Sequence, residues 1–203
     1  LDGAVLATIS YDNFSRVTGI EYTEAKDALG NKLKMTQIKR DALQRGVGSI
    51  YQTSDGKTFD ETVTLSQSGK IIGATQNYDS QTLTSTFSFD KLGRMTGATV
   101  GQTKFDYGYG TPDATCASAV GNNANAHKNS NRTSYTVTNL MTNIVAQNDK
   151  HCYDQADRLK SSTDVQIGVP TYDDHGNTAT LTGNGTPINF SYDASDYNIA
   201  IEQ

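Results

Sequence analysis

The residues best suited to chemistry in this chain are aspartates that recur at one position of a short repeated phrase. The phrase is an aromatic residue, an aspartate, two variable residues, a glycine or its substitute, and usually an arginine; its clearest form is FDKLGR at residues 89–94. Two carboxylates close together can act as acid and nucleophile, as in glycoside hydrolases. The aspartates to consider for that role are Asp12, Asp90, Asp154, Asp173 and Asp193.

The same aspartates have a structural explanation, which we favour. An aspartate at the first position of a turn accepts backbone N–H groups with its carboxylate. Glycine, as at Gly93 and Gly176, then supplies the positive φ of a type I turn that ends in a bulge. Asp157 stands at a glycine position, and aspartate tolerates this conformation better than most residues. Ser15 fits less well, so we expect strain or a different turn there. We therefore predict turn capping and no catalytic residue.

The arginines that close the phrase are Arg16, Arg94 and Arg158. We expect each to pair with a neighbouring acid or to stack on an aromatic ring of the adjacent strand. Phosphate binding by these arginines is the less favoured alternative.

Further copies of the phrase are weaker, and together the copies predict the architecture. Their first positions are residues 11, 26, 40, 65, 89, 153, 172 and 192. A step near 20 residues suits two short strands with their turns. An internal repeat of this kind indicates stacked supersecondary units. We predict an all-β fold of consecutive antiparallel β-hairpins that build part of a large curved sheet, with residues 1–203 as one repeat segment.

Alternation of side chains supports strands between the turns. Leu83, Phe87 and Phe89 share one face, as do the aromatic residues of the segment 105–109. This period of two indicates half-buried strands. Asn184-Gly185 between two such runs predicts a short hairpin. The interval 111–134 is rich in alanine, asparagine and glycine and predicts one long surface loop.

Composition argues against several functional classes. The chain has 203 residues, 35% hydrophobic residues, no tryptophan and a net charge of −5. No basic stripe is present, which argues against nucleic-acid binding. No apolar run approaches the ~20 residues that a transmembrane helix needs. The chain opens at Leu1 without an initiator methionine, so we expect it to be a piece of a longer protein.

The two cysteines, Cys116 and Cys152, are the main signal outside the repeats. A disulfide between them would join the long loop to a strand end, contribute about 4 kcal/mol by loop entropy and imply an oxidising location. Two free thiols, or a zinc site that uses Cys116, His151 and Cys152, remain as alternatives, although no CxxC spacing supports zinc. We expect His127, His151 and His175 on the surface. No phosphate loop, nucleophile elbow, metal site or cofactor motif is found.

The repeats resemble the YD repeats of the Rhs family, which includes bacterial polymorphic toxins, C components of insecticidal toxin complexes and animal teneurins. The resemblance is specific around residues 89, 153, 172 and 192 and loose between 21 and 80. The segments 105–109, 131–133 and 152–154, together with Cys116, look like secreted Rhs proteins of actinobacteria and related lineages. The resemblance implies a hollow β-sheet shell that commonly encloses a C-terminal toxic domain.

We therefore expect a non-catalytic, secreted or cell-surface shell segment whose partners are the rest of its own chain and an enclosed toxin. The family's C-terminal self-cleavage element has no match in these residues. The alternative function is an adhesin, in which the outer sheet face or the 111–134 loop contacts a cell-surface receptor or a glycan. An enzyme with a hydrolytic site among the aspartates is the least favoured reading, because repeat position already explains them.

Overall fold

The computed structural model describes residues 5–26, 29–118 and 121–203. This part of the chain is almost entirely β-structure, with short helical segments between some strands. The strands are β1 (Ala7–Tyr11), β2 (Val17–Lys26), β3 (Lys32–Arg40), β4 (Gly46–Gln52), β5 (Thr58–Leu65), β6 (Ile71–Tyr78), β7 (Gln81–Phe89), β8 (Met95–Val100), β9 (Thr103–Gly108), β10 (Ser134–Asn139), β11 (Ile144–Tyr153), β12 (Leu159–Ser162), β13 (Thr171–Tyr172), β14 (Thr178–Leu181), β15 (Ile188–Tyr192) and β16 (Asn198–Glu202). The helical segments are α1 (Ala114–Ser118), η1 (Ala126–Asn129) and η2 (Gly183–Gly185).

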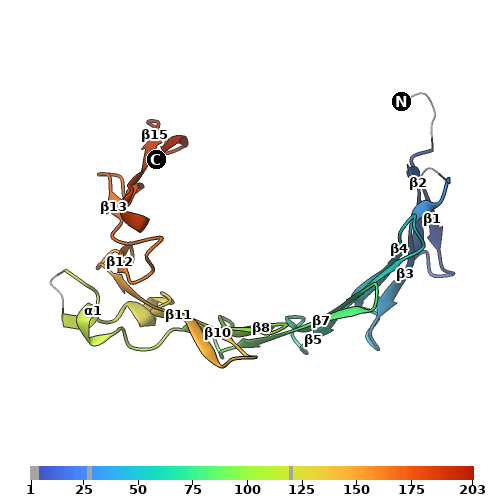
Figure 1. Cartoon of the computed structure of the whole chain (residues 1–203), viewed down its shortest axis with the longest axis horizontal. Helices are drawn as coiled ribbons and strands as arrows, with labels where there is room; N and C mark the ends of the chain where they lie inside the picture. Colours follow the sequence, from blue (N-terminus) through green and yellow to red (C-terminus); the bar gives the residue numbers. More distant parts are fainter. Residues whose placement is uncertain (1–4, 27–28, 119–120) are drawn as a thin grey trace. The chain divides into compact units, whose positions relative to one another are not determined.

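Within each sheet, every strand lies beside its neighbours in the sequence (Figure 1). One sheet has the order β1 to β12 and a second sheet has the order β13 to β16. The strand pairs are antiparallel, so successive strands form hairpins. The prediction of an all-β fold of consecutive antiparallel hairpins is confirmed, and the twelve-stranded sheet is open at both ends.

The chain divides into two compact units. Unit 1 contains residues up to Ser88 together with Thr99–Gly101, and unit 2 contains Phe89–Ala98 and Gln102–Gln203. In unit 1 the most buried side chains are those of Met35, Val47 and Ser49, which lie on β3 and β4. Such a thin apolar layer is what a sheet rich in threonine, serine and glycine can provide.

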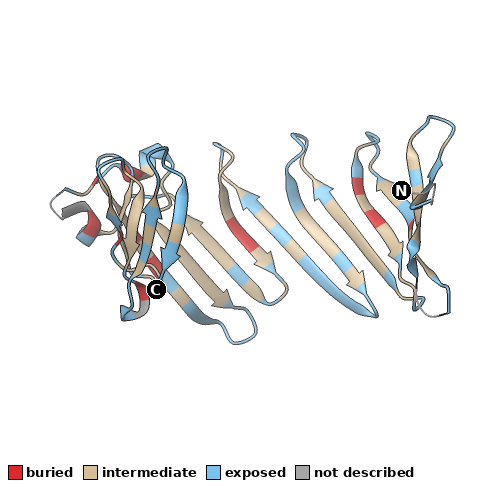
Figure 2. Cartoon of the chain, turned by 90° about the horizontal axis from the view of Figure 1, so that it is seen from above, coloured by how far each residue is buried: buried red, intermediate tan, exposed pale blue. Residues whose placement is uncertain are grey.

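In unit 2 the buried residues gather around the connection between β9 and β10. Cys116, Ala126, Thr133 and His151 are each at most 3% exposed. Figure 2 shows the buried residues of the chain as short red segments in a ribbon that is otherwise intermediate or exposed. The interval 111–134 therefore contains α1, η1 and some of the best-buried residues of the chain, and it is not an exposed loop throughout.

Most hairpins that carry the repeated phrase have a shift of register just before the turn. The shifts lie at Ser10/Tyr11, Lys39/Arg40, Thr64/Leu65, Cys152/Tyr153, Thr171/Tyr172 and Ser191/Tyr192. A bulge of this kind increases the local twist of the hairpin. Each of these turns follows an odd-numbered strand, so the three in unit 1 lie at the same end of their strands, and so do the two in the four-stranded sheet.

The turn between β14 and β15 differs from the prediction. The β14–β15 hairpin forms, but its connection contains η2 and is longer than the two-residue Asn184-Gly185 turn. The weak copy of the phrase that begins at residue 26 has Asp27 and Ala28 at its centre, and these two residues lie outside the described part of the chain.

Candidate functional site

The turn at Asp90 shows how the repeated phrase folds. One carboxylate oxygen of Asp90 accepts the backbone N–H groups of Leu92 and Arg94, both at 2.9 Å, and the other accepts the Nε–H of Arg94 at 2.7 Å. The N–H of Gly93 donates to the Asp90 carbonyl at 3.0 Å, and Gly93 has a φ of 83°. A single side chain thus satisfies two backbone donors of the turn and binds its closing arginine.

The same bonds recur in the other turns of the repeated phrase. Asp12, Asp41 and Asp154 bind the backbone and the guanidinium of Arg16, Arg45 and Arg158 in the same way. At Asp173 the arginine is replaced by Asn177, whose amide donates to the carboxylate at 3.1 Å, and at Asp193 the backbone bonds remain, to Ser195 and Tyr197. The residue at the left-handed position is Ser15, Gln44, Gly93, Asp157, Gly176 or Asp196. Ser15, with a φ of 59°, forms the same turn as the other copies and not a different one.

Two turns have a hydroxyl residue at the aspartate position, and the Thr53 hydroxyl donates to the Lys57 carbonyl at 2.9 Å. Thr53 and Ser66 make the backbone bonds of the motif with Lys57 and Lys70. The hydroxyl of Ser66 accepts the N–H of Lys70 at 3.1 Å. The Thr53 turn lies between β4 and β5 and carries neither the aromatic residue nor the arginine of the phrase. The dipeptide Asp55-Gly56 was its one signal in the sequence.

These contacts shift the pKa values of the turn aspartates downward. The hydrogen bond from Arg16 is the main reason that the pKa of Asp12 falls to about 2. At Asp90 and Asp154 partial burial acts to raise the pKa, but the bonds and the charge of the paired arginine outweigh it, so both pKa values are lowered. A carboxylate that is tied to its own turn and ionised at neutral pH is poorly suited to donate a proton to a substrate.

Two of the arginines also reach the next aromatic residue along the edge. The guanidinium carbon of Arg94 lies 4.4 Å from the ring centroid of Tyr109, and that of Arg158 lies 5.0 Å from the ring centroid of Tyr172. Arg16 instead lies over Phe14 of its own turn, at 5.0 Å. The arginines therefore both pair with acids and stack on aromatic rings, and in unit 2 the stacking connects one turn to the next element.

The connection between β9 and β10, residues 109–133, lies between the Asp90 turn and the Asp154 turn, and we call it the insertion. Arg94 donates to the carbonyl of His127 and to the Ser130 hydroxyl, each at 3.5 Å. On the other side, the amides of Asn129 and Asn131 donate to the Asp157 carboxylate at distances of 2.8–3.0 Å. The insertion thus bridges the turn that precedes it and the turn that follows it.

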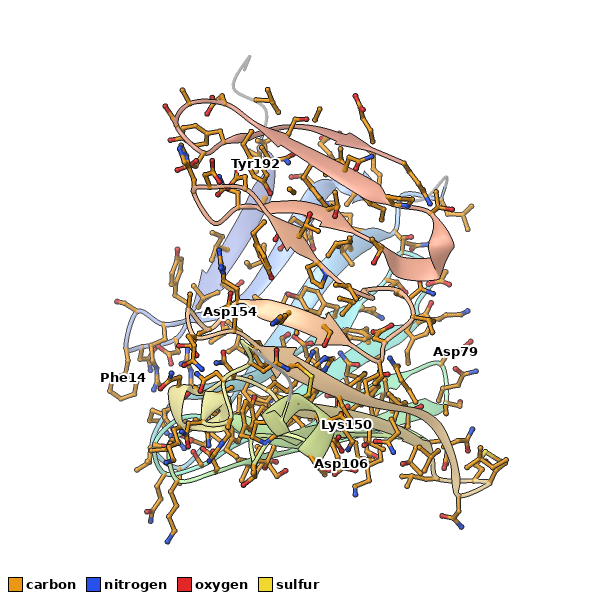
Figure 3. The ribbon with its side chains drawn as sticks, turned by 90° about the vertical axis from the view of Figure 1, so that its left-hand side faces the viewer. Phe14, Asp79, Asp106, Lys150, Asp154 and Tyr192 are labelled. Carbon is orange, nitrogen blue, oxygen red and sulfur yellow. A yellow bond between two sulfur atoms is a disulfide. The ribbon has the colours of Figure 1, made fainter. Side chains whose placement is uncertain are left out.

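A disulfide joins Cys116 of α1 to Cys152 of β11, with the Cα atoms 5.1 Å apart. The predicted disulfide is present, which excludes both the two free thiols and the zinc site. Figure 3 draws the side chains of this region together with Asp154 and Lys150. In the described residues no group of three or more His, Cys, Asp or Glu side chains is arranged to hold a metal ion.

The expectation for His151 is wrong, because this residue is 3% exposed. Its Nδ1 atom lies 3.0 Å from the Ser162 hydroxyl, and its buried Nε2 atom has no protein partner among the described residues. Burial lowers the pKa of His151. Asp149, 5% exposed, accepts bonds from Gln147 and Thr163. Ser162 and His151 lie within hydrogen-bonding distance, as a nucleophile and its base do. Asp149, the acidic residue two positions before His151, could orient the histidine only if it were not already bonded to Gln147 and Thr163.

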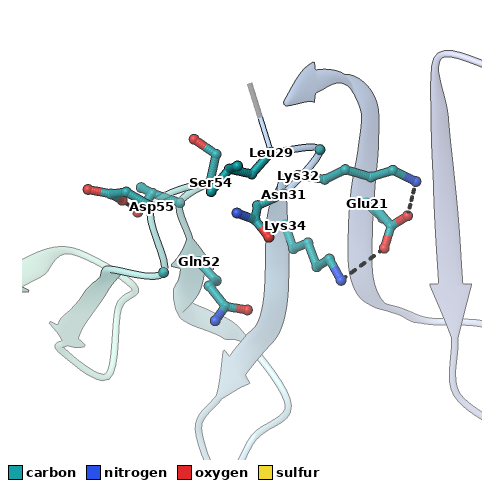
Figure 4. A pocket seen from close by; sticks show the side chains of 11 residues that line it. Glu21, Leu29, Asn31, Lys32, Lys34, Gln52, Ser54 and Asp55 are labelled. Carbon is teal, nitrogen blue, oxygen red and sulfur yellow. Dashed lines mark hydrogen bonds and ion pairs between the residues drawn. The ribbon is translucent and has the colours of Figure 1, made fainter. Parts of the chain in front are cut away.

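Unit 1 carries an open polar groove of about 670 Å³ between the turns at residues 29–31 and 53–56. Figure 4 shows Lys32 and Lys34 directed toward Glu21, with which they form ion pairs of 2.6 and 3.2 Å. The row Glu21, Lys34 and Gln52 runs across three strands and forms its floor. The charged side chains of the groove form ion pairs with acidic side chains, so the groove has a polar surface with little net charge.

Comparison with known proteins gives a fold but no family. No model of a known family matches the chain, and no curated protein matches it. No helix of the described residues is long and apolar enough to cross a membrane. A chain in a structure of a mutant Photorhabdus luminescens Tc holotoxin pore aligns with a TM-score of 0.59 and 11% identity, over 96% of this chain and 11% of that one.

A second structure, a crystal structure of TcdB2-TccC3-Cdc42, aligns at 15% identity with a TM-score of 0.38, over 97% of this chain and 11% of that one. This second score is too low to support an argument. The chain spans about a tenth of the length of either toxin chain. At these identities the likeness concerns architecture alone: the chain shares its fold with part of a Tc toxin chain.

Proposed function

We propose that this chain is a non-catalytic segment of the β-sheet shell of a larger YD-repeat protein of the toxin type. The observation that carries the proposal is the recurrence of the aspartate turn after odd-numbered strands, in which each carboxylate binds the backbone of its own turn. Residues that hold hairpins at regular intervals are what a sheet extended by repetition needs. The Tc toxin chain supports the proposal because it has the same fold over 96% of this chain.

The proposed partners are the rest of the longer protein and a toxic domain that the shell encloses. We place the protein outside the cell or on its surface, because the disulfide favours an oxidising compartment. The open strands at both ends of the twelve-stranded sheet also favour a larger assembly, since an uncovered edge strand invites further pairing. We propose a cell-surface receptor or a glycan as an additional partner, and we assign no binding site to it.

The test uses the longest natural protein that contains this segment. Electron microscopy of that protein should show a hollow particle, and a protease should digest its C-terminal domain only after the particle is denatured. A solid or filamentous particle, or a C-terminal domain that is cut at once in the intact particle, would contradict the shell proposal. The variant Lys91→Ala, at an exposed turn position, is the control and should leave both results unchanged.

A further inference from the structure

The insertion is attached to unit 2 in two chemically different ways. Its second half, residues 121–133, is held by hydrogen bonds. Asn129 and Asn131 donate to Asp157, the N–H of Asn123 donates to the Tyr153 carbonyl at 2.7 Å, and the Tyr153 hydroxyl donates to the Arg132 carbonyl at 2.9 Å. None of these bonds involves sulfur, so a change of redox conditions leaves them intact.

The first half of the insertion, which includes α1 and the buried Pro112, is joined to the sheet by a covalent bond. Cys116 is 2% exposed and its sulfur is bonded to Cys152 on β11. α1 contacts β11 and has only five residues, which is too short for a helix to be stable without tertiary contacts. The amide of Asn122 donates to the Cys116 carbonyl at 3.0 Å, but this bond ties α1 to the rest of the insertion and not to a strand.

We propose that the Cys116–Cys152 disulfide is a reducible latch. A thiol reductant such as glutathione opens it and releases residues 111–118 from β11, while residues 121–133 stay on the Asp157 turn. The device would report a transfer of the protein from an oxidising to a reducing compartment. This inference rests on the geometry of unit 2 and holds whether or not the shell proposal is correct.

The chemistry of the opening is two successive thiol–disulfide exchanges. A reductant thiolate attacks the Cys152 sulfur, which is the more exposed of the two, and Cys116 leaves as a thiolate that takes up a proton. A second reductant thiolate then attacks the reductant sulfur of the mixed disulfide, and Cys152 leaves in turn. Two protein thiols form, and two reductant thiols are oxidised to one disulfide.

The strands on either side of α1 do not depend on the disulfide. β10 pairs with both β9 and β11 over six residues, and the rings of Tyr107 and Tyr135 stack at 5.5 Å on that sheet. Reduction should therefore free one segment and leave the sheet in place. A local opening of this kind is what hydrogen exchange detects.

The experiment is hydrogen–deuterium exchange of the protein with and without 10 mM glutathione, with free thiols counted in the same samples. We expect two thiols after reduction, exchange of peptides from residues 111–118 faster by about tenfold or more, and exchange of β10 and of residues 121–133 unchanged within about twofold. The variant C116S/C152S should behave as the reduced protein and should not respond to glutathione. Asp157→Asn should accelerate exchange in residues 121–133 with the disulfide intact.

Three results would overturn the proposal. Reduction could yield two thiols with no change in residues 111–118, which would show that α1 is held by other contacts. The native protein could yield no thiols, which would show that the bond is inaccessible. Exchange could increase equally in β10, which would show that the bond supports the whole unit and is not a latch.

Discussion

The guanidinium carbon of Arg158 lies 5.0 Å from the ring centroid of Tyr172, while the Nε atom of the same arginine donates to Asp154 at 2.8 Å. The Tyr172 hydroxyl donates to the carbonyl of Leu159 at 2.7 Å, so Tyr172 contacts both Arg158 and the residue that follows it. Aspartate, arginine and the next tyrosine thus form one chain of contacts. The repeated phrase encodes a link between neighbouring hairpins as well as a turn.

Removal of this link should destabilise unit 2 modestly. Arg158→Ala loses a partly exposed ion pair and a cation–π contact, and we expect the free energy of unfolding to fall by about 1–2 kcal/mol. Denaturant unfolding followed by circular dichroism measures the change. Combined with Tyr172→Leu, the double-mutant cycle should show a coupling of about 0.5–1 kcal/mol. Additive effects would mean that the stacking contributes nothing, and Tyr172→Phe serves as the control that removes only the hydroxyl bond.

The residues at the left-handed turn position should respond to glycine in opposite directions. Ser15 has a φ of 59° and its hydroxyl makes no hydrogen bond with another described residue, so Ser15→Gly relieves strain and should stabilise unit 1 by about 0.5–1 kcal/mol. Asp157 has a φ of 61°, but its carboxylate holds Asn129 and Asn131, so Asp157→Gly should destabilise unit 2. Thermal unfolding compares the two variants with Gly93→Ala, which should lower the Tm. Equal effects at residues 15 and 157 would refute the role given to the Asp157 carboxylate.

The sequence predicted those features that depend on residues close together in the chain. The turn at Asp90 is complete within five residues, so its aspartate, glycine and arginine could be recognised from their spacing alone. The burial of His151 could not, because this residue contacts Ser162 on β12 and Thr133 at the end of the insertion, which lie 11 and 18 positions away in the sequence. The asparagines that bind Asp157 precede it by more than 25 residues, and neither their spacing nor their type indicates that partner. The disulfide could be predicted because the chain has two cysteines.

Two histidines of unit 2 should titrate on opposite sides of pH 6.5. Burial lowers the pKa of His151, whereas the hydrogen bond and charge of Asp196, 2.8 Å away, raise the pKa of His175. The stability that depends on neutral His151 is present above pH 6.5 and is lost as the pH falls through its folded pKa. The stability from charged His175 is present below pH 6.5 and is lost as the pH rises through its folded pKa.

Nuclear magnetic resonance titration of the imidazole protons measures both midpoints, with His151→Gln and His175→Gln to assign the signals. The His175 midpoint should return toward 6.5 in Asp196→Asn, which removes the charge but keeps a side chain of the same shape. The His151 midpoint should not move in that variant. A His151 midpoint at or above 6.5 in the native protein would contradict the burial that the structure shows.

Gly48 on β4 lies tightly against the backbone of β5 in unit 1. A Cβ atom at this position would lie 2.1 Å from the Glu61 carbonyl oxygen and 2.9 Å from the Thr62 Cα atom, both in the backbone of β5. Lys39, Gly48 and Thr62 share one row across three strands, and Lys39 passes over the glycine to bind the Thr62 hydroxyl at 2.6 Å. A side chain at residue 48 would therefore push β5 away and break this bond as well.

Gly48→Ala should accordingly reduce the free energy of unfolding of unit 1 by about 2–4 kcal/mol, with faster hydrogen exchange in β4 and β5. Gly46 is the matched control, since it lies on the same strand and a Cβ atom there meets nothing within 4 Å. Gly46→Ala should change the stability by no more than about 0.5 kcal/mol, because it adds no clash and only restricts the unfolded chain. The difference between the two alanine variants isolates the contact with β5, because both remove the same backbone freedom. If the two variants proved equally stable, β5 would be able to move away from β4 without loss of stability. The tight packing of β4 against β5 would then not contribute to the free energy of unfolding.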